Sequence, residues 1–280
     1  MRRTLAVSLL LLCAAVPASA APAPAAKPAA PPAPFTLEHA LTLNSISSLT
    51  WSADGRRLAF VVSSVDTAEN TINQDLWLYE HATGRTVQLT RHAKNDFSPT
   101  FSPGGDTIAF ISTRATGDDA KPAIYMISLR GGEPWAFGGY DEGVGEVAWS
   151  PDGRFLAFVK PDTLPQRVRD WRKKKWDQVV EDERFQYSHL WVVVIATGQQ
   201  RRLTSGTQWV WNARWSPDSR ALAFLVSPTG KVDDANSADV GIVAAAGGPM
   251  RKLGVIGDGS FAWSPDSRWI ALATGADRAK

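Results

Sequence analysis

The segment Trp149-Ser150-Pro151-Asp152-Gly153-Arg154-Phe155-Leu156-Ala157-Phe158 returns, with small changes, four more times along the chain. The other copies are WSADGRRLAF at 51–60, FSPGGDTIAF at 101–110, WSPDSRALAF at 215–224 and WSPDSRWIAL at 263–272. A unit that recurs with a period of about 50 residues is typical of repeat architectures. This segment, called the decapeptide below, therefore decides the fold.

Each decapeptide predicts two strands joined by a tight turn. The fixed φ of proline suits the second turn position, aspartate can hydrogen-bond back to the backbone, and glycine accepts a positive φ. After the turn, Leu156 and Phe158 alternate with Ala157 and Val159, which is the two-residue period of a strand. We therefore expect every decapeptide to form a β-hairpin.

A second hairpin is expected between successive decapeptides. In the first repeat, DLWLY at 75–79 leads through Ala-Thr-Gly into TVQLT at 86–90, and comparable pairs follow at 124–135, 190–204 and 240–253. Two hairpins per repeat make a four-stranded blade, so the predicted fold is all-β, a β-propeller. A β-sandwich also has short, evenly spaced strands, but it does not require one turn motif to return in phase five times.

The fifth repeat contributes only its first hairpin before the sequence stops at Lys280. Four full repeats and half of a fifth predict an incomplete ring with open sheet edges, which invite association. A closed four-bladed ring is possible but would leave the fifth hairpin without a place. We therefore expect a partial propeller over residues 35–280, forming the N-terminal part of a longer protein.

The third repeat is longer than the others, and the extra residues fall between 160 and 187. Within them, Val168, Trp171, Trp176, Val179 and Val180 recur near helical spacing among charged residues. This pattern predicts one amphipathic helix inserted between two strands of a blade. It fits a solvated surface helix that packs its tryptophans on the blade, and it also fits an element that gates a ligand or docks a domain.

The N-terminus carries a secretory signal. Arg2 and Arg3 precede an apolar run that is too short to span a bilayer, and small residues end at Ala20, where cleavage is expected. The signal peptide is thus 1–20, and 21–34 is an Ala/Pro-rich linker that cannot form a helix. The single cysteine, Cys13, lies in the signal, so the mature chain has no disulfide. A periplasmic or secreted location is expected.

Charge gives no reason to propose a nucleic-acid or membrane partner. The chain has 30 Lys and Arg against 28 Asp and Glu, and two of the arginines lie in the signal peptide. The mature chain is therefore balanced, without the basic excess that binding to phosphate backbones or anionic lipids requires.

No catalytic, cofactor-binding or metal-binding residue is predicted in this chain, and no cofactor is expected. The sequence has no Gly-x-Ser-x-Gly elbow, HExxH, Walker loop, GxGxxG or EF-hand motif. The acidic residues that stand side by side are interpreted as solvated surface: Asp118, Asp119, Asp233, Asp234, Glu181, Asp182 and Glu183. His39 is interpreted as a surface histidine, and the remaining histidines lack the spacing of metal ligands: His81, His92 and His189.

Three further segments extend the pattern. The folded part opens at 35–49 with a short helical lead-in at 36–41, for which Thr36 is a possible cap; 130–134 is Arg-Gly-Gly-Glu-Pro, and 183–191 is Glu-Arg-Phe-Gln-Tyr-Ser-His-Leu-Trp. With the decapeptides, these resemble the WD-like, TolB-like propeller of the prolyl oligopeptidase family, in its dipeptidyl-peptidase and acylaminoacyl-peptidase branch. The Tol-Pal translocation protein has a similar propeller but places a separate α/β domain before it.

The resemblance implies a periplasmic serine peptidase in which the propeller gates the access of short peptides to a C-terminal α/β-hydrolase domain. The catalytic triad of that family lies in the hydrolase domain, so none of it falls on a residue here and the chain itself is expected to be inactive. Some dipeptidyl peptidases grip the substrate's amino terminus with propeller acids, but Glu181 and Glu183 do not match that spacing. The alternative is a non-enzymatic periplasmic propeller that binds protein partners.

Overall fold

The structure, a computed structural model, describes residues 35–273 apart from 37–38, 40–41, 68, 116–120, 139, 141, 175–185, 232–233, 235–237 and 256–259. The expected signal peptide and linker, 1–34, lie outside the described residues. No helix in the described part of the chain is long and apolar enough to cross a membrane.

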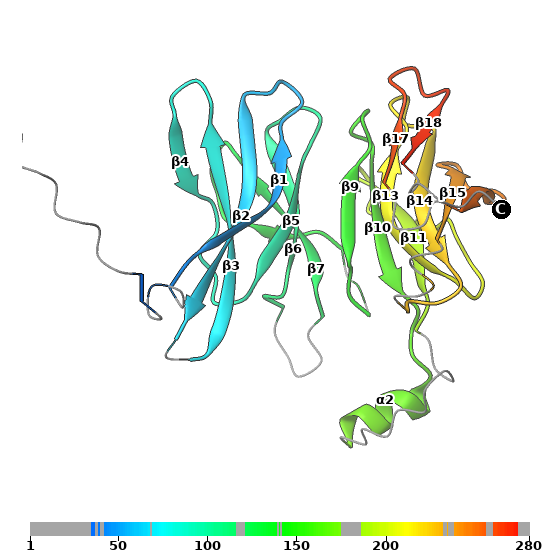
Figure 1. Cartoon of the computed structure of the whole chain (residues 1–280), viewed down its shortest axis with the longest axis horizontal. Coiled ribbons are helices and arrows are strands. Elements are labelled where there is room, and N and C mark those ends of the chain that lie inside the picture. The colour runs from blue at the N-terminus through cyan, green and yellow to red at the C-terminus, as the bar shows by residue number, and fades with distance from the viewer. Residues whose placement is uncertain are drawn as a thin grey trace, which may run out of the picture.

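The fold is all-β and consists of four-stranded antiparallel blades, as predicted (Figure 1). Blade 1 contains β1 (Ser45–Trp51), β2 (Arg57–Asp66), β3 (Thr71–Glu80) and β4 (Arg85–Gln88). Blade 2 contains β5 (Asp96–Phe101), β6 (Thr107–Ser112), β7 (Ala123–Ser128) and β8 (Trp135–Ala136). Blade 3 contains β9 (Glu146–Trp149), β10 (Phe155–Pro161), β11 (Ser188–Val194) and β12 (Gln200–Arg202). Blade 4 contains β13 (Trp209–Trp215), β14 (Ala221–Ser227), β15 (Asp239–Ala244) and β16 (Arg251–Val255). The C-terminal hairpin is β17 (Phe261–Trp263) and β18 (Ile270–Leu272).

The turn of the decapeptide closes by a repeated set of hydrogen bonds. In blade 3, the N–H of Gly153 donates to the Ser150 carbonyl at 2.9 Å, and the Ser150 hydroxyl donates to Asp152 Oδ1 at 2.6 Å. The same carboxylate oxygen accepts the N–H of Arg154 at 3.0 Å. Partial burial acts to raise the pKa of Asp152, but the Ser150 hydroxyl and Arg154 outweigh it and hold that pKa below its ordinary value. The aspartate therefore serves the backbone geometry of the turn.

The residue after this aspartate has a left-handed backbone in every copy. Gly55, Gly105 and Gly153 have φ between 67° and 73°, and Ser219 and Ser267 occupy the same position with φ of 62° and 61°. A non-glycine residue in this region is strained, by about 1–2 kcal/mol. The backbone strain at the two serines must therefore be offset by a contact of their side chains.

The serine side chains hydrogen-bond the turn of the preceding blade. Ser219 Oγ accepts the N–H of Asp152 at 3.0 Å, and Ser267 Oγ accepts the N–H of Asp218 at 3.0 Å. These bonds fasten blade 4 to blade 3 and the C-terminal hairpin to blade 4. We call each such bond a turn latch.

The aromatic residue that opens each decapeptide makes a second contact with the preceding blade. Trp215 Nε1 donates to the Ala148 carbonyl at 3.1 Å, and Trp263 Nε1 donates to the Arg214 carbonyl at 3.2 Å. Trp149 Nε1 is buried without a hydrogen-bond partner among the described residues. The contact between blades 2 and 3 thus lacks a bond that the next two junctions possess.

The second strand of blades 2, 3 and 4 is buried on both faces, which explains its alternation of large and small residues. Leu156 and Phe158 pack with blade 2 in one hydrophobic cluster, whereas Ala157 and Val159 pack with blade 4 in another. Burying a side chain of this size contributes about 1.5–3 kcal/mol. The core is therefore a series of apolar layers between blades, and each blade depends on its neighbours.

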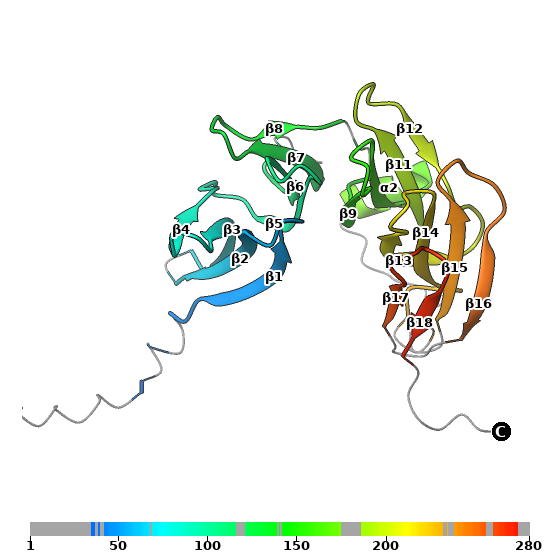
Figure 2. The same cartoon turned by 90° about the horizontal axis from the view of Figure 1, so that it is seen from above.

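The blades follow one another around a common centre, with β1, β5, β9 and β13 toward the centre and β4, β8, β12 and β16 on the outside (Figure 2). β5 contacts blade 1, β9 contacts blade 2, and β13 contacts blade 3. The described blades form an open arc.

The insert of the third repeat begins with one helix, α2 (Gln166–Lys173), which projects away from the blades (Figure 1). The Arg167 guanidinium lies over the Trp171 ring at 4.8 Å. The predicted helix is thus confirmed for its first two turns, while 175–185 lies outside the described residues. At the chain's start, the N–H of His39 donates to Thr36 Oγ1 at 3.3 Å, which is the predicted capping contact.

Candidate functional site: the central channel

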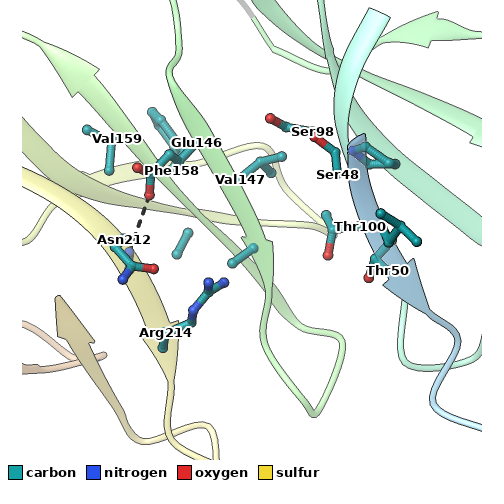
Figure 3. Close-up of a pocket in the computed structure, with 15 residues that line it drawn as sticks. Ser48, Thr50, Ser98, Thr100, Glu146, Val147, Phe158, Val159, Asn212 and Arg214 are labelled. Atoms are coloured by element: carbon teal, nitrogen blue, oxygen red, sulfur yellow. Dashed lines mark hydrogen bonds between the residues drawn. The ribbon is translucent and has the colours of Figure 1, made fainter. Parts of the chain in front are cut away.

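The innermost strands of the four blades enclose a cavity of about 400 Å³ (Figure 3). It is lined by the residues three, two and one positions before the decapeptide aromatic in every complete blade, together with 157–159 of β10. These are Ser48, Leu49, Thr50, Ser98, Pro99, Thr100, Glu146, Val147, Ala148, Asn212, Ala213 and Arg214. The cavity is therefore the central channel of the propeller.

Three of the channel residues sit at β-bulges. Ser48, Ser98 and Asn212, each three positions before the aromatic, have positive φ values of 52°, 52° and 54°. At each of them the pairing register of the innermost strand shifts by one residue. Bulges re-aim side chains at the rims of sheets and near binding sites. Here they present short polar side chains to the channel.

Blade 3 breaks the pattern, because Glu146 takes the place of the left-handed residue. Its strand β9 pairs with β10 in regular register. The Glu146 carboxylate accepts the N–H of Ala213 from blade 4 at 3.3 Å, which fixes it at the wall between two blades.

The channel is electrostatically divided. In Figure 3 the hydroxyl side chains of Ser48, Thr50, Ser98 and Thr100 lie on one side, while Glu146, Asn212 and Arg214 lie on the other. One wall therefore offers neutral donors and acceptors, and the facing wall offers one charge of each sign.

A second cavity, of about 310 Å³, adjoins the first and shares Glu146 and Val159 with it. Its lining is more apolar and includes Pro122, Trp209 and Trp211. The two cavities meet at Glu146, so this carboxylate faces both a polar and an apolar compartment.

The channel residues are suited to hydrogen bonding. Nucleophilic catalysis by a hydroxyl requires a base within hydrogen-bond reach, and no histidine is among the residues that line either cavity. The described residues contain no group of three His, Cys, Asp or Glu side chains that could hold a metal ion. What the arrangement offers is a passage with hydrogen-bonding walls.

His189 is fully buried at the base of the insert, where the sequence indicated only an isolated histidine. Its Nε2 lies 3.1 Å from Asp162 Oδ2 and its Nδ1 lies 3.3 Å from Thr204 Oγ1. Burial lowers the pKa of His189, and the Arg202 guanidinium acts in the same direction, against the opposing effect of Asp162. The imidazole therefore ties the strand that enters the insert to the strand that leaves it.

The other sequence candidates are dispersed. His81 and His92 are exposed, and His92 Nδ1 accepts the N–H of Lys94 at 3.1 Å. Asp234 accepts a hydrogen bond from the Thr229 hydroxyl. Four sets lie outside the described residues: 118–119, Asp233, 181–183 and the signal-peptide Cys13. None of the described candidates lines either cavity.

Sequence reasoning missed the channel residues, although a signal existed. They stand at fixed offsets before the decapeptide aromatic, where the repeat varies between Ser, Glu and Asn. Core packing does not fix the residue type at a position that varies inside an otherwise regular repeat, so such a position is a candidate for binding.

Comparison with known proteins agrees with this architecture. The chain is 29% identical over 216 residues to the uncharacterized peptidase YuxL of Bacillus subtilis, a match over 72% of this chain and 32% of that protein. Its structure is similar to the acylaminoacyl peptidase of Pyrococcus horikoshii, with a TM-score of 0.58 and 15% identity, over 83% of this chain and 36% of that one. The chain has the fold of a TolB-like β-propeller, and its sequence is similar to that of a peptidase.

The propeller type is further supported by TolB of Acinetobacter baumannii, with a TM-score of 0.56 and 20% identity over 81% of this chain and 48% of that one. No family model matches the sequence. The chain spans about a third of the length of YuxL. The similarity thus concerns the propeller region of a longer peptidase relative.

Proposed function

We propose that the chain is the propeller of a periplasmic or secreted serine peptidase of the dipeptidyl-peptidase and acylaminoacyl-peptidase branch. Its channel gates the entry of short peptides to a C-terminal α/β-hydrolase domain of the same polypeptide, which supplies the catalytic triad. The observation that carries this proposal is a propeller whose sequence is similar to a peptidase and whose channel is lined by hydrogen-bonding side chains.

The channel walls suit an extended peptide. Backbone amides and carbonyls need hydrogen-bond partners whenever they leave water, and the hydroxyls of Ser48, Ser98, Thr50 and Thr100 provide both donors and acceptors. A cavity of about 400 Å³ has room for only a few residues of a peptide.

The first test is the reading frame downstream of Lys280, which must encode a Gly-x-Ser-x-Gly elbow in an α/β-hydrolase domain. Absence of that motif sinks the proposal and leaves a propeller that binds protein partners. A pull-down of envelope proteins with the purified chain then tests that alternative.

The gating role needs a variant that narrows the channel. In the full-length gene product, we expect Thr100→Trp to lower kcat/KM for peptides of several residues while sparing a small chromogenic substrate. Thr86→Trp, at an exposed threonine of the outer strand β4, is the matched control. If Thr100→Trp lowers kcat/KM equally for both substrates, or if Thr86→Trp lowers it as much, entry through the channel is contradicted.

A further inference from the structure

The second cavity beside the channel, called the side pocket below, is enclosed by residues of blades 2, 3 and 4. Its walls are formed by Pro122 before β7, the segment 142–146, the end of β10, and the first residues of β11 and β13. Blade 1 and the C-terminal hairpin, at the two ends of the arc, contribute no lining residue. The side pocket is thus bounded only by blades that have a neighbour on both sides.

Backbone hydrogen bonds hold the wall on the side of blade 2. The N–H of Val144 donates to the Pro122 carbonyl at 3.0 Å, and the N–H of Gly145 donates to the Val159 carbonyl at 2.9 Å. Gly143 has a positive φ of 85°, and a Cβ added there would lie 3.1 Å from the Pro122 ring. The segment that leads into β9 is therefore fixed between blade 2 and β10.

The wall toward blade 4 is held by a buried serine. The Ser188 hydroxyl donates to the Val210 carbonyl at 2.9 Å and accepts the Val210 N–H at 2.9 Å. Both residues are buried. Because both walls are fixed, the pocket is formed before a ligand enters, which lowers the conformational cost of binding.

The interior of the side pocket is mainly apolar. Val144, Val159 and Val210 are buried, and Pro122 and Pro161 are half-buried. Lysine and arginine bury their methylene stems against apolar surface of this kind and keep the charged end in a polar environment. A volume of about 310 Å³ has room for one such side chain.

The charged residues of the side pocket are both acidic. Glu142 and Glu146 line it, and no lysine, arginine or histidine is among its lining residues. Arg214 lines the channel but not the side pocket. Glu146 stands where the two cavities meet (Figure 3), and its carboxylate accepts only the uncharged N–H of Ala213 in the hydrogen bond described above. A carboxylate at an apolar wall loses solvation, so the pocket favours a positively charged occupant.

A metal ion does not match this lining. Calcium takes about six to eight oxygen ligands, and magnesium needs a near-octahedral set. The part of the chain that the structure describes has no group of three His, Cys, Asp or Glu side chains that could hold a metal ion. An organic cation with an aliphatic stem and a positive end matches both the walls and the charges.

We propose that the side pocket binds the side chain of a lysine or arginine, carried by a peptide that lies in the channel. The inference rests on the proposed function for the peptide in the channel, whereas the walls and charges of the pocket are independent of it. The methylene stem packs on the valines and prolines, and the positive group pairs with the carboxylates of Glu142 and Glu146. A neutral side chain would leave both carboxylates without a cation and an acidic one would be repelled, so the pocket selects basic peptides.

Calorimetric titration of the purified chain tests the pocket by itself. The probes are Nα-acetyl-lysine amide and Nα-acetyl-norleucine amide, which has the same stem without the ammonium group. We expect wild type to bind the lysine amide about tenfold more tightly, because norleucine loses the charged hydrogen bonds to the carboxylates. Glu142→Gln should remove most of this preference. Glu133→Gln, at an exposed glutamate in the turn before β8, is the matched control and should keep it.

Glu146→Gln is a second test variant. Its amide oxygen can still accept the Ala213 N–H, so the contact between blades 3 and 4 is kept while the charge is removed. Far-UV circular dichroism checks that each variant is folded. Equal affinity of wild type for the two amides overturns the proposal, and so does a lysine preference that survives in both Glu142→Gln and Glu146→Gln.

The full-length gene product separates this inference from the proposed function. Its kcat/KM is measured on peptides that carry one lysine or one norleucine at each position in turn. We expect lysine to raise kcat/KM about tenfold at one position and Glu142→Gln to remove the gain. Cleavage without any lysine preference overturns the side pocket and leaves the peptidase proposal standing. Glu142-dependent binding of the lysine amide without peptidase activity sinks the proposed function and leaves the side pocket as a site for a basic side chain of a protein partner.

Discussion

The turn latch between blades 3 and 4 makes a prediction that separates hydrogen bonding from backbone strain. Ser219 has a strained left-handed backbone, with φ of 62°. Its hydroxyl oxygen accepts the N–H of Asp152 at 3.0 Å. Ser219→Ala removes the acceptor and keeps the strain. Ser219→Gly removes the acceptor and relieves the strain.

The magnitudes follow from the two contributions. Losing one partly buried hydrogen bond costs about 1 kcal/mol, so Ser219→Ala should lower the free energy of unfolding by about that much. Glycine regains about 1–2 kcal/mol of left-handed strain but gives back about 0.5–1 kcal/mol through the greater freedom of the unfolded chain. Ser219→Gly should therefore lie within about 0.5 kcal/mol of wild type.

An equivalent turn in blade 1 provides the strain control. Gly55 has φ of 67°, and a Cβ added there would meet nothing within 4 Å. Gly55→Ala therefore adds strain alone and should destabilise by about 0.5–1 kcal/mol.

Urea unfolding of the four proteins, followed by tryptophan fluorescence, gives the differences from the midpoints at a common slope. If Ser219→Gly is destabilised as much as Ser219→Ala, the strain argument is refuted. If Ser219→Ala equals wild type, the latch contributes nothing and the explanation for the two serines fails.

Three other outcomes are expected. Gly241→Ala should destabilise by about 1–3 kcal/mol in the same unfolding assay, because its Cβ would lie 2.6 Å from the Phe224 ring; a smaller loss would show that the ring can move aside. Trp215→Phe keeps the ring but loses the bond to the Ala148 carbonyl, so a loss of about 1 kcal/mol is expected, and an unchanged midpoint would rule the bond out as a stabilising contact. Burial lowers the pKa of His189, so below about pH 6.5 the unfolded chain binds a proton that the folded chain resists. The free energy of unfolding should therefore decrease as the pH is lowered. His189→Gln should show a smaller decrease between pH 7.5 and 5, and an identical decrease would assign the effect to other groups.

The fold could be read from the sequence because the decapeptide constrains each residue locally. Its turn favours a proline, which four of the five copies carry, and needs a residue that tolerates positive φ, while its strand needs large side chains on one face and small ones on the other. These requirements recur as the same residue types at the same positions of the five copies. The register inside each blade then follows from the short turn, as the pairing of Trp149 with Leu156 shows.

The site could not be read in the same way, because its contacts join residues that no local rule connects. His189 meets Asp162 across the whole insert, and only the strand pairing of Lys160 with His189 brings them together. The bulges at Ser48 and Ser98 were equally hidden, since a left-handed serine leaves no signal in composition. The extent of the inserted helix beyond Lys173 also depends on contacts that the periodicity of Trp176 and Val180 does not specify.

The division of labour along the innermost strand explains how a single scaffold can serve different binding tasks. The residue at the position of Phe101 packs against the preceding blade, so any change there costs packing between blades. The residues at the positions of Ser98 and Thr100 face the channel and contribute little to the core. Glu146 shows how a channel can acquire a charge in place of a left-handed serine. The bulge is lost in this blade, while the pairing of β9 with β10 stays regular.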